Sequence, residues 1–151
     1  MDQGSHDRVV RYIADNRFPF PGQTTWPADY VTLTNVPVRR QGIPCEGSIH
    51  YPDILVVDAT GQACEIGEVE YAVGPDLLPH LRACSDAADD LTPTKVRHFF
   101  LYVPLGLESA ATALLDQAGI SYAGVRSFHI DDTGAISITP HVTHGDSYDH
   151  Q

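Results

Sequence analysis

The chain of 151 residues is long enough for one domain with a sizeable core, and its hydrophobic fraction of 42% excludes a disordered protein. Its net charge of −11 disfavours non-specific binding to nucleic acid, because such binding depends on basic residues that release counterions. No apolar run approaches the roughly 20 residues that span a bilayer, and the N-terminus lacks the basic and apolar regions of a signal peptide. We therefore expect a cytoplasmic protein without a membrane segment.

The first half of the chain predicts a helix, a strand and a long hairpin. The helix has an apolar stripe at helical spacing and is ended by a proline-rich stretch, and the strand alternates and is rich in β-branched residues. Two apolar runs around a glycine-containing turn indicate the hairpin. In order, these are helix 5–16, prolines at 19–21, strand 30–36, exposed turn 39–42 and hairpin 50–58 with 65–70.

The second half predicts two helices that alternate with strands. Pro79 falls in the first turn of the earlier helix, where proline is tolerated, and Gly119 suits the position just after the later one. In order, the elements are helix 76–90, apolar strand 96–103, helix 108–118 and hairpin strands 121–130 and 135–139. We expect one domain over 1–139 and a polar, frayed tail over 140–151.

Together these elements predict an α/β fold in which helices flank a mixed central sheet, because the apolar strand is reached through a helical crossover. The three cysteines, Cys45, Cys64 and Cys84, are widely spaced and form no CxxC pair, which fits a reducing compartment. Cys64 and Cys84 fall in predicted elements, so we expect small core residues rather than reactive thiols.

The long hairpin carries acids where a buried strand should carry aliphatic residues. With a two-residue tip, the register sets Asp53 opposite Glu68, and strand alternation puts Glu68 and Glu70 on one face. Like charges placed opposite each other destabilise a sheet, and a bound divalent cation is the simplest compensation. A slip of one residue would turn every side chain to the other face. Asp58 and Glu65, near the turn, are expected to face solvent.

Pro52-Asp53 followed by Glu68-Val69-Glu70 resembles the motif of the PD-(D/E)xK nuclease superfamily, the fold of restriction endonucleases and Holliday-junction resolvases. The order of helix, three strands, helix and strand is similar to the αβββαβ core of that superfamily, so the resemblance covers roughly residues 5–103, with extra C-terminal strands beyond. It implies that Asp53, Glu68 and the Val69 carbonyl hold Mg²⁺ (or Mn²⁺). The ion would polarise a DNA phosphodiester and activate the attacking water.

Glu70 stands where the motif has lysine. A carboxylate supplies no positive charge, but it can act as a general base or bind a second metal ion. Two functions therefore stay open: a Mg²⁺-dependent nuclease acting on DNA, and a catalytically inactive homologue that serves as a binding or assembly module. The Asp53–Glu68 pair favours the enzyme, whereas the acidic composition favours the binding module. A homodimer is compatible with cutting two strands, although no residue indicates a dimer surface.

Basic residues near the motif are candidates for the missing cation and for DNA contacts. Lys95 begins the apolar strand that neighbours the hairpin in the superfamily topology, so it is a candidate catalytic residue in place of the motif lysine. Arg39, Arg40 and Arg97 are candidates for contacts to nucleic-acid phosphates. Each has a simpler alternative, an exposed turn or a solvated strand end. His80, on the helix after the acidic strand, either points into the site or lies on the surface.

Overall fold

The computed structural model describes residues 3–18, 29–90, 94–146, 149 and 151. Its elements are α1 (Gln3–Arg17), β1 (Val31–Thr34), β2 (Ile43–Cys45), β3 (Ser48–His50), β4 (Ile54–Val57), β5 (Ala63–Val69), the short 3₁₀ helix η1 (Pro75–Leu77), α2 (Leu78–Ala87), β6 (Phe99–Pro104), α3 (Glu108–Ala118), β7 (Gly124–Ile130) and β8 (Ile136–Thr143). The prolines expected to end the first helix, at 19–21, lie outside the described residues. Of the helices described, none is long and apolar enough to cross a membrane.

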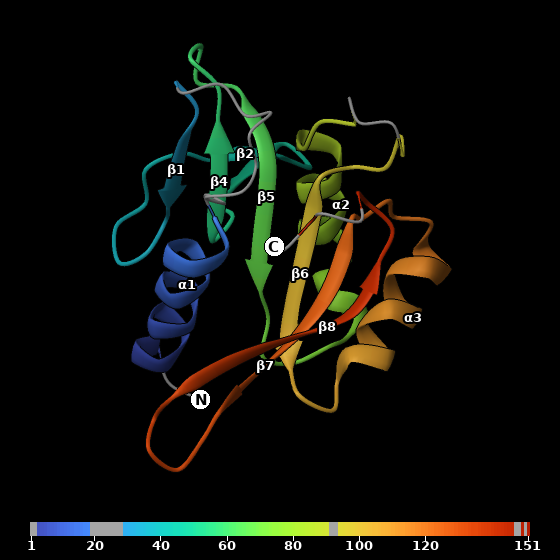
Figure 1. Ribbon diagram of the computed structural model, residues 1–151. Helices are drawn as coiled ribbons and strands as arrows, with labels where there is room; N and C mark the ends of the chain where they lie inside the picture. Colours follow the sequence, from blue (N-terminus) through green and yellow to red (C-terminus); the bar gives the residue numbers. More distant parts are fainter. Residues whose placement is uncertain (1–2, 19–28, 91–93, 147–148, 150) are drawn as a thin grey trace.

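Six strands form one mixed sheet in the order β1-β4-β5-β6-β7-β8 (Figure 1). The β5–β6 and β6–β7 pairs are parallel, and the other pairs are antiparallel. Helix α1 covers one face of the sheet, and α2 and α3 cover the other. The α/β fold with a mixed central sheet flanked by helices is therefore confirmed.

The sheet separates two apolar cores, and β5 contributes to both. Ile66 packs with Leu81 and Leu115 on the side of α2 and α3, whereas Val69 packs with Ile13 on the side of α1. Because side chains alternate along a strand, Glu68 shares a face with Ile66 and therefore points toward α2. Full burial of each large apolar side chain contributes roughly 1.5–3 kcal/mol, so the two cores hold β5 firmly in the centre of the sheet.

A small hairpin of β2 and β3 forms a separate two-stranded sheet, which the sequence did not predict. Its strands have only three residues each, too few to show alternation, and Pro44 interrupts the pattern. Strand β2 packs against α2, and β3 ends at His50, directly before the Pro52-Asp53 motif. The hairpin therefore carries His50 to the edge of the acidic site.

The C-terminal segment departs from the expected frayed tail. Strand β8 continues to Thr143, and Asp149 and Gln151 are buried. Pro140 is tolerated because β8 is an edge strand and the pairing shifts beside it, between Val125 and Arg126. The Tyr102 hydroxyl donates a hydrogen bond to the Gln151 carbonyl, which ties the end of the chain to the sheet.

Candidate functional site

The register of the acidic hairpin agrees with the prediction in the half that carries the motif. Ile54 pairs with Gly67 and Leu55 with Ile66, so Asp53 comes to lie beside Glu68 one step further along. A β-bulge between Val56 and Val57 changes the pairing only toward the turn. The acids are therefore brought together by the regular part of the hairpin.

Backbone hydrogen bonds fix the two central acids. The Asp53 N–H donates to Glu68 Oε1 at 3.0 Å, and the Val69 N–H donates to Asp53 Oδ2 at 2.8 Å. Both side chains are buried, as is Asn35, whose side chain donates to the Pro52 carbonyl. The Pro52-Asp53 corner is thus held in place before any ligand binds.

An open cavity of about 460 Å³ lies at the C-terminal end of β5. Its walls are formed by His6, His50, Tyr51, Asp53, Glu68, Val69, Glu70, Tyr71, Ala72, Val73, Gly74, Asp76 and Leu77. A neighbouring cavity of about 470 Å³ shares His6, His50, Tyr51 and Asp53 with it and also includes Arg39. All three motif acids thus line one cavity, and Arg39 lines the cavity next to it.

Burial and mutual repulsion disfavour the charged forms of two of these acids. Burial raises the pKa of Glu68 well above its ordinary value, and Asp53 and Glu70 raise it further. Burial, followed by the charge of Asp53, raises the pKa of Glu70 to about 7. Among the described residues that line the first cavity, no lysine or arginine offsets these charges. The cavity therefore favours a ligand that brings positive charge.

His6 of α1 is the basic group that faces the acids, and sequence reasoning did not identify it. Its Nε2 lies 3.4 Å from Asp53 Oδ1. The hydrogen bond to Asp53 is the main cause that raises the pKa of His6 to about 9, and a hydrogen bond to the backbone of Val69 contributes. A protonated imidazole thus stands beside two of the groups that the resemblance assigns to a metal ion, Asp53 and Val69.

His50 is the second histidine of the site that sequence reasoning missed. Its Nε2 lies 2.6 Å from Glu68 Oε2, and its ring stacks on His80 with a centroid separation of 4.3 Å. Burial, followed by repulsion from His80, lowers the pKa of His50 to about 4. Because the pKa of Glu68 is raised, both shifts favour an uncharged pair in which the Glu68 carboxyl donates to the imidazole. No sequence pattern marks either His6 or His50, since only the tertiary fold brings them to the hairpin.

The side chains closest to metal-ligating geometry include only one of the predicted acids. Ligand atoms of His50, Glu68 and Cys84 all lie within 4.8 Å of one another, with Sγ of Cys84 3.9 Å from Glu68 Oε2. Within the described parts of the chain, Asp53, Glu68 and Glu70 do not form such a triplet. A cation held by Asp53 and Glu68 would therefore keep several waters, as Mg²⁺ commonly does in proteins.

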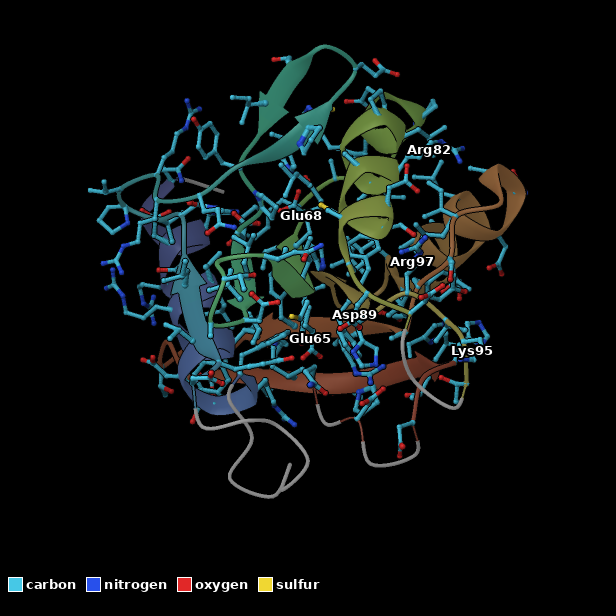
Figure 2. All side chains as sticks on the ribbon, turned by 90° about the horizontal axis from the view of Figure 1, so that it is seen from above. Glu65, Glu68, Arg82, Asp89, Lys95 and Arg97 are labelled. Atoms are coloured by element: carbon cyan, nitrogen blue, oxygen red, sulfur yellow. The ribbon has the colours of Figure 1, made fainter. Side chains whose placement is uncertain are left out.

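The structure places Lys95 and Arg97 at the opposite end of the sheet from Glu68. Because β5 and β6 run parallel and Ile66 pairs with Phe99, the residues before β6 lie near the beginning of β5, not its end. Lys95 is exposed, and the Arg97 guanidinium donates to the Ala88 carbonyl at 2.9 Å. In Figure 2 both lie apart from Glu68. The expectation that Lys95 and Arg97 lie next to the acidic residues is thus corrected.

Arg39 and Arg40 differ in their relation to the site. The Arg39 guanidinium carbon lies 4.7 Å from the centroid of the Tyr51 ring, at the wall of the neighbouring cavity. Arg40 is exposed, and its backbone N–H donates to Asn35. Of these two arginines, Arg39 therefore lines the cavity that also includes Asp53, and Arg40 does not.

Cys64 and Cys84 are buried, free thiols, as expected from the sequence.

Comparisons with known proteins identify no family for this chain. A scan against protein-family models, a search of curated proteins and a search of solved structures each found no match. The resemblance to the PD-(D/E)xK superfamily therefore remains a prediction that rests on the motif residues.

Proposed function

We propose that the protein is a divalent-cation-dependent nuclease that hydrolyses phosphodiester bonds in DNA. The observation that carries this proposal is the convergence of Asp53, Glu68 and Glu70 on one open cavity. Burying carboxylates is costly unless they are paired or coordinate a metal ion. His6 is the only cationic side chain among the described residues lining this cavity; it contacts Asp53, and its charge also acts on Glu70. A bound divalent cation would favour the ionised forms of Glu68 and Glu70, whose pKa values are raised without it.

The available donors suit Mg²⁺ or Mn²⁺. Asp53, Glu68 and the Val69 carbonyl offer hard oxygen ligands, which these ions prefer. The bound ion would polarise the scissile phosphodiester and lower the pKa of the attacking water. The backbone donors of Asp53 and Val69 already hold the two carboxylates in place, so binding requires little ordering of these side chains.

Glu70 has the properties of a general base in this proposal. Its pKa of about 7 lies close to physiological pH, where a proton acceptor works most effectively. This role does not need the positive charge of the lysine that Glu70 replaces. We also propose a cytoplasmic location, which the three free cysteines support.

The competing candidate is a catalytically silent binding or assembly module. Few basic side chains surround the acids, which favours this candidate. Among the described residues, the first cavity is lined by no lysine or arginine, and the neighbouring cavity includes Arg39. Gripping a phosphate backbone depends on such residues. Cation binding and DNA cleavage must therefore be tested separately.

Cation binding is tested by calorimetric titration of Mg²⁺ and Mn²⁺ into the wild type, Asp53→Asn and Asp76→Asn. Asp76 lines the same cavity but lies on η1, outside the motif, so Asp76→Asn is the matched control. We expect binding in the wild type and the control and none in Asp53→Asn. Absence of cation-dependent heat at millimolar concentrations in the wild type would exclude the proposed metal site.

Cleavage is tested on supercoiled plasmid, branched DNA and single-stranded RNA with Mn²⁺ present. The nuclease proposal expects DNA cleavage that is lost in Glu70→Gln. Nicking without linearisation would indicate one active site per molecule, whereas linearisation in one event would indicate a homodimer. If the wild type is silent and Glu70→Lys cleaves DNA, the binding module is the correct alternative.

A further inference from the structure

A second arrangement of metal-ligating atoms lies on the α2 side of β5. One ligand atom each of His50, Glu68 and Cys84 lies within 4.8 Å of the other two. They come from three separate elements, the end of β3, strand β5 and helix α2. We propose that these three side chains bind a transition-metal cation of the Zn²⁺ class, at a site distinct from the Mg²⁺ or Mn²⁺ site.

The distances are close to those that such an ion requires. Zn²⁺ binds nitrogen, oxygen and sulfur at about 2.0–2.3 Å, which places tetrahedral ligand atoms roughly 3.3–3.7 Å apart. Glu68 Oε2 lies 3.9 Å from Cys84 Sγ and 2.6 Å from His50 Nε2. The first distance nearly fits, and the second must open by about 1 Å. His50 ends a short peripheral strand and is only part-buried, so its ring can make this adjustment.

The ligand types exclude Mg²⁺ and select a softer ion. A thiolate and an imidazole are preferred by Zn²⁺ and its neighbours in the first transition row, whereas Mg²⁺ takes oxygen ligands. Three protein ligands leave a fourth position for water, as in many zinc sites. His80 also lies close, because it precedes Cys84 by one helical turn and its ring stacks on His50. The ion can reach the site through the cavity, whose wall includes His50 and Glu68.

The two sites share Glu68 but use different neighbours. Glu68 Oε1 accepts the Asp53 N–H on the motif side, whereas Oε2 faces His50 and Cys84. The Zn²⁺-class site needs neither the Asp53 carboxylate nor Glu70. An ion bound there would connect the β2–β3 hairpin to the central sheet and to α2, and would therefore stabilise the fold.

Co²⁺ is the probe that tests this proposal, because a cobalt–thiolate bond gives a charge-transfer absorption that oxygen and nitrogen ligands do not give. We expect one equivalent of Co²⁺ to produce this band in the wild type, and Zn²⁺ to displace it. Cys84→Ser and Cys84→Ala should abolish the band. Cys64→Ser is the matched control, because Cys64 is also buried and lies on the same strand as Glu68, and it should keep the band.

Two further variants keep the test decisive if the Cys84 variants fold poorly. His50→Gln changes a part-buried side chain and should weaken Co²⁺ binding about 100-fold or more, since even loss of an outer partner costs 10–100-fold. Asp53→Asn should keep the band while it loses Mn²⁺ binding, which separates this site from the proposed function. No band in the wild type at millimolar Co²⁺, or a band that survives both Cys84 variants, would overturn the proposal.

Discussion

Strand β5 buries a carboxylate near each of its ends, and the two acids differ in their surroundings. Glu68 accepts a backbone N–H, contacts His50 and lines an open cavity. Glu65 points to the opposite face, toward α1, and is 1% exposed against 2% for Glu68. Neither carboxyl oxygen of Glu65 has a hydrogen-bond partner in the part of the chain that the structure describes. The two carboxyl groups are thus equally buried, but only Glu68 has hydrogen-bond partners among the described residues and lines a cavity.

The pKa values do not distinguish the two ends, because both acids are shifted in the same direction. Burial raises the pKa of Glu65 well above its ordinary value, and the charges of Asp149 and Asp89 add to the shift. Burial likewise dominates the raised pKa of Glu68. What marks the Glu68 end as a candidate site is therefore the set of fixed donors and the cavity, and not the perturbed pKa.

The largest expected effect is stabilisation by a cation at one end only. Saturating Mn²⁺, at about 100 times the dissociation constant, adds about 2.7 kcal/mol to the free energy of unfolding. For a chain of this size that raises Tm by about 5–10 °C. We expect this shift in thermal unfolding of the wild type and Glu65→Gln, and none in Asp53→Asn. An equal shift in Asp53→Asn would place the cation elsewhere.

Replacing each acid by methionine without metal should change stability in opposite directions. Glu65→Met removes a buried carboxyl without a hydrogen-bond partner, so the free energy of unfolding should rise by about 1–3 kcal/mol. Glu68→Met leaves the buried Asp53 N–H without its acceptor, so the free energy should fall by about 1–3 kcal/mol. Urea unfolding at neutral pH measures both. Destabilisation by Glu65→Met would mean that Glu65 is as well paired as Glu68.

The site end of β5 could be predicted from sequence because its geometry is local. Asp53 and Glu68 lie on neighbouring strands of one hairpin, and the strand period alone sets them beside each other. The bulge between Val56 and Val57 lies on the turn side of these pairs, so it leaves the register of the acids intact. The α/β class followed from equally local patterns in the helices and apolar strands.

The other end of β5 was predicted wrongly, because its environment is assembled from distant segments. Glu65 was expected to face solvent, but it pairs with Val56 inside the sheet, and the buried C-terminal residues Asp149 and Gln151 return toward this side. The same limit explains why His6 was missed, since its contact with Asp53 depends on how α1 packs. Sequence periodicity carries no information about such contacts.

A further effect concerns the pH dependence of stability. The pKa of Glu70 is raised from 4.5 to about 7, so the stability that its protonated form contributes is fully present below pH 4.5 and is lost as pH rises through 7. Glu70→Gln should remove this loss, because glutamine does not titrate. The difference in unfolding free energy between Glu70→Gln and the wild type should therefore change between pH 4.5 and 7 and stay constant above pH 7. Glu65→Gln should show a change of the same sign as pH rises above 4.5, because the pKa of Glu65 is also raised. Urea unfolding at several pH values measures both differences, and parallel curves for the wild type and Glu70→Gln would contradict the assignment.

The smallest expected effect lies at Lys95, which tests whether the Glu65 end of the sheet has any part in the site. Lys95 has a backbone φ of +58°, a left-handed conformation that costs a non-glycine residue about 1–2 kcal/mol. Lys95→Gly removes this strain but adds the conformational entropy of glycine in the unfolded chain, so the net gain should be at most about 1 kcal/mol.

Lys95→Ala is the matched control, because it removes the same charge and keeps the strained backbone. We therefore expect urea unfolding to show a gain for Lys95→Gly alone. Calorimetry should show unchanged Mn²⁺ affinity for both variants, since the parallel pairing of β5 with β6 puts Lys95 at the far end from Glu68. Weaker Mn²⁺ binding in both variants would mean that Lys95 contributes to the cation site. The two ends of β5 would then not be functionally separate.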